Sequence, residues 1–146
     1  MAAISDLIAH GHFVIAAGGG IPVVRDPRGR LTGVEAVVDK DRTSSLLARE
    51  LAADLFILLT GVPQVVKNFG KKNQQALPVL PLAEARRLLK RGQFPQGSMG
   101  PKIEASIDFV AATGKTALIT DIAHLAEALA GKDGTTVVPD PVGGRR

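Results

Sequence analysis

The sequence predicts an α/β fold in which a mainly parallel sheet is sandwiched by helices. Short apolar runs at residues 55–60, 116–120 and 135–139 indicate buried strands. Helical patterns at residues 41–53, 82–91, 101–113 and 123–130 alternate with these runs. Alternating strands and helices are typical of a layered α/β fold, and strands without polar alternation are typical of a sheet covered on both faces.

The composition excludes several classes of protein. A hydrophobic content of 45% in 146 residues fits one folded domain and argues against disorder. The absence of Cys excludes a disulfide framework, a thiolate zinc site and a cysteine nucleophile. No apolar stretch reaches about 18 residues, so we expect no membrane span, and the N-terminus has no secretion signal, so we expect a cytoplasmic location.

The mild excess of positive charge fits a small anionic ligand as well as it fits a nucleic acid. The net charge is +4, but the basic residues are spread along the sequence, and no Trp or Tyr is present to stack on bases. We therefore expect no nucleic-acid partner. The three histidines share no metal-binding spacing, so we expect no metal site.

The first 40 residues contain three predicted elements. Residues 2–9 indicate the end of a helix, and residues 12–17 indicate a buried strand that leads into three glycines. Two runs around the turn at residues 26–29 predict a β-hairpin insertion near residues 21–38. A self-contained domain rarely begins in the middle of such a unit, so we expect a missing amino-terminal portion. We assign residues 1–140 to one unit and residues 141–146 to a loose tail.

The remaining helices show start and stop signals. Pro81 stands near the start of the helix at residues 82–91, and Gly114 ends the helix at residues 101–113. Asp121 is a plausible N-cap for residues 123–130. The segment Gly114–Thr116 resembles the end of a phosphate-binding P-loop, but it follows a helix and precedes a strand, so we interpret it as a helix stop.

Three segments carry residues suited to an anion. Gly18, Gly19 and Gly20 could present backbone N–H groups at the end of a strand, or could form only a flexible turn. In Asp39-Lys40-Asp41, either Asp could cap the following helix, or the carboxylates could hold Lys40 as a fixed positive charge. Both alternatives stay open for each segment.

The third segment is Gly97–Lys102. Lys102 falls in the first turn of a predicted helix, where the helix dipole makes a cation unfavourable by about 0.3–1 kcal/mol. An anion bound at the same helix end would reverse that sign. The alternative is a solvated surface lysine.

Several of these segments together resemble a known family. The matching stretches are VIAAGGGIPVV (14–24), GVEAVVDKD (33–41), FILLTGV (56–62), NFGKKNQ (68–74), GSMGPKIEASIDFV (97–110) and GTTVVPD (134–140). They are collinear and cover nearly all of residues 4–140. The sequence resembles the carboxyl-terminal half of carbamate kinases, which are members of the amino-acid kinase family.

The resemblance implies a fold, a reaction and a set of site residues. Family members share a helix-covered sheet, usually form homodimers, and transfer a phosphoryl group between ATP and carbamate with Mg²⁺. By resemblance, Asp41 orients the catalytic lysines Lys40 and Lys102, and Gly18–Gly20 line the active-site cleft. The implied nucleotide neighbours are Thr60, Gly61, Val62, Asn68 and Met99.

The sequence also departs from the family pattern. Gly61 stands where the family has Asp, Val66 stands where an aromatic Tyr is usual, and Ala17 replaces the first of four glycines. The amino-terminal half carries another catalytic lysine and much of the acid substrate site, so we expect residues 1–146 alone to be inactive. The alternatives are a non-catalytic nucleotide- or anion-binding module, and one half of a split enzyme completed by a separate amino-terminal half.

Overall fold

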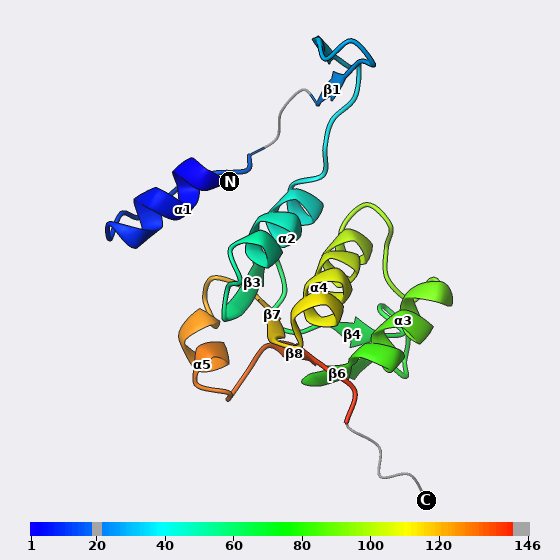
Figure 1. Ribbon diagram of the computed structural model, residues 1–146. Coiled ribbons are helices and arrows are strands. Elements are labelled where there is room, and N and C mark those ends of the chain that lie inside the picture. Colours follow the sequence, from blue (N-terminus) through cyan, green and yellow to red (C-terminus); the bar gives the residue numbers. More distant parts are fainter. Residues whose placement is uncertain (19–21, 142–146) are drawn as a thin grey trace, which may run out of the picture.

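A four-stranded mixed sheet forms the centre of the computed structural model, which describes residues 1–18 and 22–141 (Figure 1). The strand order is β3-β7-β8-β6, and the pairs β3/β7 and β8/β6 are parallel, whereas β7/β8 is antiparallel. The mainly parallel sheet expected from the sequence is therefore confirmed, with one antiparallel pairing. The strands are β3 (Leu55–Leu59), β6 (Val79–Pro81), β7 (Thr116–Thr120) and β8 (Thr135–Val138).

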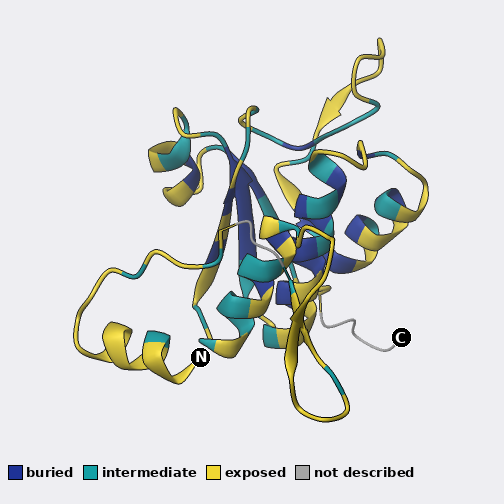
Figure 2. Ribbon diagram, turned by 90° about the horizontal axis from the view of Figure 1, so that it is seen from above, coloured by how far each residue is buried: buried dark blue, intermediate teal, exposed yellow. Residues whose placement is uncertain are grey.

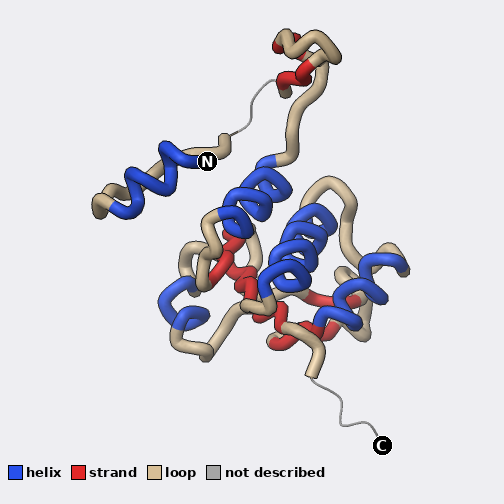
Figure 3. The backbone as a smooth tube through the Cα atoms, viewed as in Figure 1, coloured by secondary structure: helices blue, strands red, loops and turns tan. Residues whose placement is uncertain are grey.

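Helices cover both faces of this sheet. The first face is covered by α2 (Lys40–Glu50), α3 (Leu82–Lys90) and α4 (Met99–Thr113), which lie side by side in Figures 1 and 3. The short helix α5 (Leu125–Leu129) lies on the other face. There Ala128 of α5 and Leu118 of β7 both lie close to Gly134, which precedes β8. Alternate residues of β7 therefore face different helices, as the period of a strand requires.

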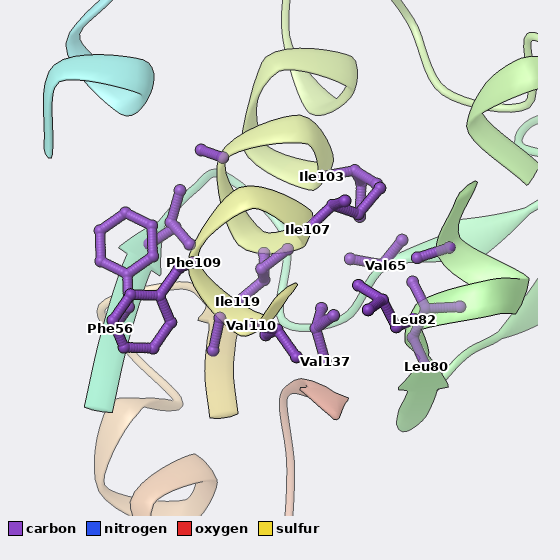
Figure 4. Packing of buried hydrophobic residues seen from close by; sticks show 14 of the residues in the cluster. Phe56, Val65, Leu80, Leu82, Ile103, Ile107, Phe109, Val110, Ile119 and Val137 are labelled. Atoms are coloured by element: carbon purple, nitrogen blue, oxygen red, sulfur yellow. The ribbon is translucent and has the colours of Figure 1, made fainter. Parts of the chain in front are cut away.

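The core lies between the sheet and the helices α2–α4 (Figure 4). Phe56 of β3 and Phe109 of α4 pack with their ring centroids 5.4 Å apart. Ile103 of α4, Leu80 of β6 and Ile119 of β7 are fully buried in the same cluster. Each such side chain contributes about 1.5–3 kcal/mol when it leaves water, so this cluster supplies much of the driving force for folding.

The strand at residues 55–60 is not covered on both faces, and that prediction is wrong. Phe56 and Leu58 are buried, but Leu55, Ile57 and Leu59 are 37–43% exposed. β3 is also one of the two edge strands of the sheet. The helix α5 packs on β7, its neighbour, and leaves the second face of β3 open.

The predicted strand at residues 12–17 is absent, which is a second correction. Phe13 and Ile15 are fully exposed, and the segment is paired with no strand among the described residues. A strand needs a neighbour to accept its backbone hydrogen bonds, and an apolar run alone cannot supply one.

Two elements at the beginning of the chain match the prediction but pack on little. The helix α1 (Ala2–Ala9) forms as expected and buries no residue. The strands β1 (Val23–Arg25) and β2 (Leu31–Gly33) form the predicted antiparallel hairpin, which is shorter than residues 21–38. Figure 2 shows α1 mostly in the colour of exposed residues, and every residue of β1 and β2 is exposed.

The remaining boundaries differ from prediction by a few residues. The helix α4 begins at Met99 rather than residue 101, and Gly114 ends it in the left-handed conformation, φ 69°. Asp121 accepts a hydrogen bond from the His124 N–H at 2.8 Å, so it caps the turn before α5. Residues 61–80, where the sequence predicts no regular element, contain a small antiparallel ribbon of β4 (Val66–Lys67) and β5 (Gln75–Ala76).

Two further sequence predictions concern membranes and the tail. No helix among residues 1–18 and 22–141 combines the length and apolarity that a membrane span requires. The predicted tail falls mostly on residues 142–146, which lie outside the described residues.

The packing of α5 gives a first prediction. Gly134 has φ +80°, and a Cβ there would lie 2.9 Å from both the Ala128 Cβ and the Leu118 Cδ1. Gly131 has a similar φ of +72° but no atom within 4 Å. Gly134→Ala should lower the free energy of unfolding by about 1–3 kcal/mol more than Gly131→Ala, because only the former adds overpacking to backbone strain. Urea unfolding of both variants measures this, and equal losses would contradict the packing described for α5.

Candidate functional site

The N-terminal ends of α2 and α4 meet at one edge of the sheet. The C-terminal end of α2 leads into β3, and that of α4 leads into β7. Both helices therefore begin near the C-terminal ends of β3 and β7. Ligands of open α/β sheets bind beyond the C-terminal ends of the strands, and two helix N-termini there favour negative charge.

Asp39 is the residue that caps α2. Its Oδ1 accepts hydrogen bonds from the backbone N–H groups of Asp41 at 2.9 Å and Arg42 at 3.0 Å. The cap therefore uses the first carboxylate of the Asp39-Lys40-Asp41 segment and leaves the side chain of Asp41 available for another partner.

Asp41 holds Lys102. The Lys102 Nζ lies 3.1 Å from both carboxylate oxygens of Asp41, and each residue is only 9% exposed. This burial rules out the alternative of a solvated surface lysine at 102. The Lys40 Nζ lies 4.0 Å from the Asp41 Oδ2, and its side chain is 68% exposed. The Asp41 carboxylate thus stands beside two ammonium groups, near the N-terminal, positive ends of two helix dipoles.

Two more contacts fix α2 against α4. The Ser45 hydroxyl donates to the Ala105 carbonyl oxygen at 2.8 Å in the buried part of the contact. On the exposed side, the Arg42 Nη2 donates to the Glu104 Oε2 at 2.5 Å, and this carboxylate raises the pKa of Arg42 above its ordinary value. Together with the Asp41–Lys102 pair they define what we call the α2–α4 seam.

A cavity of about 530 Å³, here the ribbon cavity, opens beside the start of α4. It includes Thr60, Gly61, Val62 and Met99, four of the five residues expected near a nucleotide. None of its lining residues is charged. They are Thr60, Gly61, Val62, Pro63, Gln64, Val66, Phe69, Gln74, Ala76, Gln93, Phe94, Pro95, Ser98 and Met99.

Asn68, the fifth expected residue, does not line the ribbon cavity. It has a φ of 55°, its N–H donates to the Gln93 Oε1 at 3.2 Å, and its Nδ2 donates to the Asn73 carbonyl oxygen at 3.3 Å. Asn tolerates this left-handed conformation better than most residues. Asn68 therefore shapes the loop that follows β4.

Sequence reasoning missed Phe69, which this loop places on the cavity wall. Its ring is 65% exposed and supplies an aromatic surface in the region where Val66 lacks one. The signal in the sequence was the NFG segment, because the residues on either side of Phe69 both adopt positive φ, 55° and 73°. Aromatic faces of this kind stack on flat heterocycles.

Three glutamines on the same wall were also missed. The Gln64 Nε2 donates to the Asp133 Oδ1 at 2.7 Å, the Gln74 Oε1 accepts from the Gly70 N–H at 2.9 Å, and the Gln93 Oε1 accepts from Asn68. Each bond orients one end of an amide and leaves the other end for a ligand. The wall thus combines an aromatic face with polar groups that carry no charge.

The glycine segment is described only in part. Gly18 is exposed, and a Cβ placed there would meet no atom within 4 Å. Gly19 and Gly20 lie outside the described residues, so their role stays a prediction. Within the described residues, no three His, Cys, Asp or Glu side chains are grouped as metal ligands.

The sequence matches the amino acid kinase family over residues 1–121, and the chain belongs to this family. Among its relatives, it is 49% identical to the carbamate kinase of Thermoplasma volcanium over 138 residues, and 48% identical to carbamate kinase 3 of Staphylococcus aureus over 136. These alignments cover 94% and 92% of this chain but 45% and 44% of the relatives. The chain thus spans less than half the length of the curated relatives it matches.

Solved structures agree with the fold. The carbamate kinase from Giardia lamblia bound to AMP-PNP superposes with a TM-score of 0.90 at 41% sequence identity. The match covers 95% of this chain and 44% of that one. The N-acetylglutamate synthase from Neisseria gonorrhoeae, at 15% identity and a TM-score of 0.68, shares the fold alone.

Replacing Lys102 and replacing Lys40 by Ala should have different effects on the stability of the fold. Lys102→Ala removes the partner of a buried carboxylate and should lower the free energy of unfolding by about 3 kcal/mol. Lys40→Ala, on an exposed side chain, should change it by less than about 0.5 kcal/mol. Urea unfolding monitored by circular dichroism compares them, and an Lys102→Ala chain as stable as the parent would show that the pair is not buried as described.

Proposed function

We propose that this chain forms the nucleotide-side part of a carbamate kinase, which transfers a phosphoryl group between ATP and carbamate to give ADP and carbamoyl phosphate. One observation carries the proposal. The buried Asp41–Lys102 pair, with Lys40 beside it, lies one helical turn from Met99 on the wall of the uncharged ribbon cavity. A cavity suited to a base and sugar thus adjoins cations suited to phosphates.

The similarity to known proteins supports the same reaction. The relatives at 48–49% identity are named carbamate kinases, and the structure from Giardia lamblia was solved with AMP-PNP. The alternative of a non-catalytic nucleotide- or anion-binding module is not favoured by these similarities. A split enzyme would carry the same site and the same chemistry.

In this proposal the lysines stabilise the phosphoryl group in flight. Phosphoryl transfer requires little covalent chemistry from the protein, because positioned cations and N–H dipoles neutralise the charge that spreads over the equatorial oxygens. Lys40 and Lys102 supply those cations, and Asp41 is the positioning residue that fixes both. Gly18–Gly20 would add backbone N–H groups, and Mg²⁺ would enter with the nucleotide as part of the substrate.

The base would bind in the ribbon cavity. Phe69 would stack on it, and the free amide ends of Gln64, Gln74 and Gln93 would meet its polar edge. Asn68 would act indirectly, through the loop that carries Phe69. We include a cytoplasmic location in the proposal, because the reaction needs a supply of ATP.

Residues 1–146 alone should bind nucleotide without turning it over. The relatives are more than twice as long, and in this proposal the acid-substrate side of the site would come from a part that residues 1–146 do not include. The proposal also includes a partner for this chain, which would be a separate amino-terminal half or a second copy in a homodimer. ADP formation by the purified chain, abolished by Lys40→Ala, would contradict the predicted inactivity.

Calorimetric titration with MgADP tests the nucleotide site. The parent chain should bind with a Kd between about 1 μM and 1 mM. Phe69→Ala should weaken binding at least about fivefold, because base–aromatic stacking contributes about 1–3 kcal/mol. Lys40→Ala should also weaken it and has the advantage that it preserves the fold.

Phe13→Ala is the control, since this ring is also exposed but lies on the segment before the glycines. The absence of heat from a folded parent chain, or equal binding by the Phe69→Ala and Phe13→Ala variants, would contradict a nucleotide site in the ribbon cavity.

The departure at Gly61 can be reversed. A Cβ at Gly61 meets no atom within 4 Å, so Gly61→Asp should change the free energy of unfolding by less than about 0.5 kcal/mol. The added carboxylate should favour MgADP over metal-free ADP, because it attracts the cation and repels bare phosphates. Titrations of both ligands against Gly61→Asn, which has the same size without the charge, measure the effect. An unchanged ratio of the two affinities would place position 61 away from the phosphates.

A further inference from the structure

A second cavity of about 740 Å³ lies between α2, α3 and α4. It shares no lining residue with the ribbon cavity. It is formed by residues that the proposed reaction does not use. They are Val38, Arg42, Thr43, Leu46, Arg49, Arg86, Leu89, Lys90, Glu104, Ile107 and Asp108. We call it the helix cavity.

The charged residues of the helix cavity are mostly cations. Four basic side chains stand against the two carboxylates of Glu104 and Asp108. Arg42 is paired with Glu104 in the α2–α4 seam. The other three, Arg49, Arg86 and Lys90, form no ion pair with any described residue. The wall therefore has an excess of about two positive charges that an anion could neutralise.

The same cavity contains an apolar surface. Leu46 is 50% exposed and Val38 is 42% exposed, whereas Ile107 is buried and Leu89 is half-buried. Exposed aliphatic side chains among arginines are unfavourable in water, and a ligand with an apolar body would cover them. The volume lies within the range of small-molecule sites, about 300–1,000 Å³.

We propose that the helix cavity binds a small organic dianion with an apolar body, of the class of aryl phosphate monoesters. The anionic group would contact Arg49, Arg86 and Lys90, which come from two different helices, and the body would cover Leu46 and Val38. Guanidinium groups suit phosphate because their planar donors can bind two oxygens at once. The site lies outside the proposed catalytic machinery and goes beyond the proposed function.

The first test uses 1-naphthyl phosphate as the probe. The full 146-residue chain, labelled with ¹³C at Ile, Leu and Val methyl groups, is titrated in the presence of saturating MgADP, which occupies any nucleotide site. The resonances of Leu46, Leu89 and Ile107 should shift and saturate with a Kd below about 1 mM. Neutral 1-naphthol and inorganic phosphate should each bind at least about tenfold more weakly, because each supplies only half of the recognition.

Charge reversal identifies the cations. Arg86→Glu/Lys90→Glu should weaken binding of the probe at least about tenfold. Arg28→Glu/Lys132→Glu makes the same change in net charge at exposed positions away from the cavity and should leave the affinity within about twofold. Circular dichroism confirms that both variants are folded before the comparison is made.

Three outcomes would overturn the proposal. The first is that no methyl resonance shifts at 10 mM probe, about ten times the highest expected Kd. The second is that the shifts occur at Val62 and Val66 of the ribbon cavity and not at Leu46 and Ile107. The third is that both charge-reversed variants weaken binding equally, which would indicate attraction by net charge alone.

Discussion

The contact between Asp41 and Lys102 holds together the two helices that form the candidate site. These residues are separated by 61 positions, yet a bidentate contact at 3.1 Å joins the first turns of two neighbouring helices. A buried lysine needs a carboxylate, and a buried carboxylate needs a cation, so neither helix can shift without a cost. The core beneath, with Ile103 and Phe109 on α4, gives the pair a rigid base. The site is therefore only as well ordered as the packing of α2 on α4.

The fold was predictable wherever local patterns and tertiary neighbours agree. The runs that became β7 and β8 are strands because both lie inside the sheet and receive partners on each side. The run at residues 12–17 is also mainly apolar but pairs with no strand among the described residues, and its Phe13 and Ile15 are exposed. Hydrophobic periodicity indicates which side chains of a segment could be buried. Whether they are buried depends on the neighbours that the sheet order gives the segment. This is also why the face of β3 carrying Ile57 was expected to be covered and is not.

The site could be predicted only in part, for a different reason. Spacing alone left open whether Asp39 or Asp41 caps α2, because both acids stand at the start of the helix. Only the direction of each side chain separates the cap from the lysine partner. The family resemblance brought Asp41 and Lys102 together where no short-range rule could. Phe69 was missed because its position depends on a loop with two positive φ angles, which neither the helical nor the strand period describes.

Because α1 and the β1–β2 hairpin are exposed, their stability is separate from that of the layered body that follows them. An isolated helix below about 12–15 residues and a single two-stranded hairpin are each marginal in water, and α1 has 8 residues with none buried. Their amide hydrogens should exchange with solvent through local fluctuations, while those of β7 exchange only when the layered body opens as a whole. Denaturant unfolding of this chain therefore reports the cooperative unit that begins near α2, and changes before it alter flexibility far more than global stability.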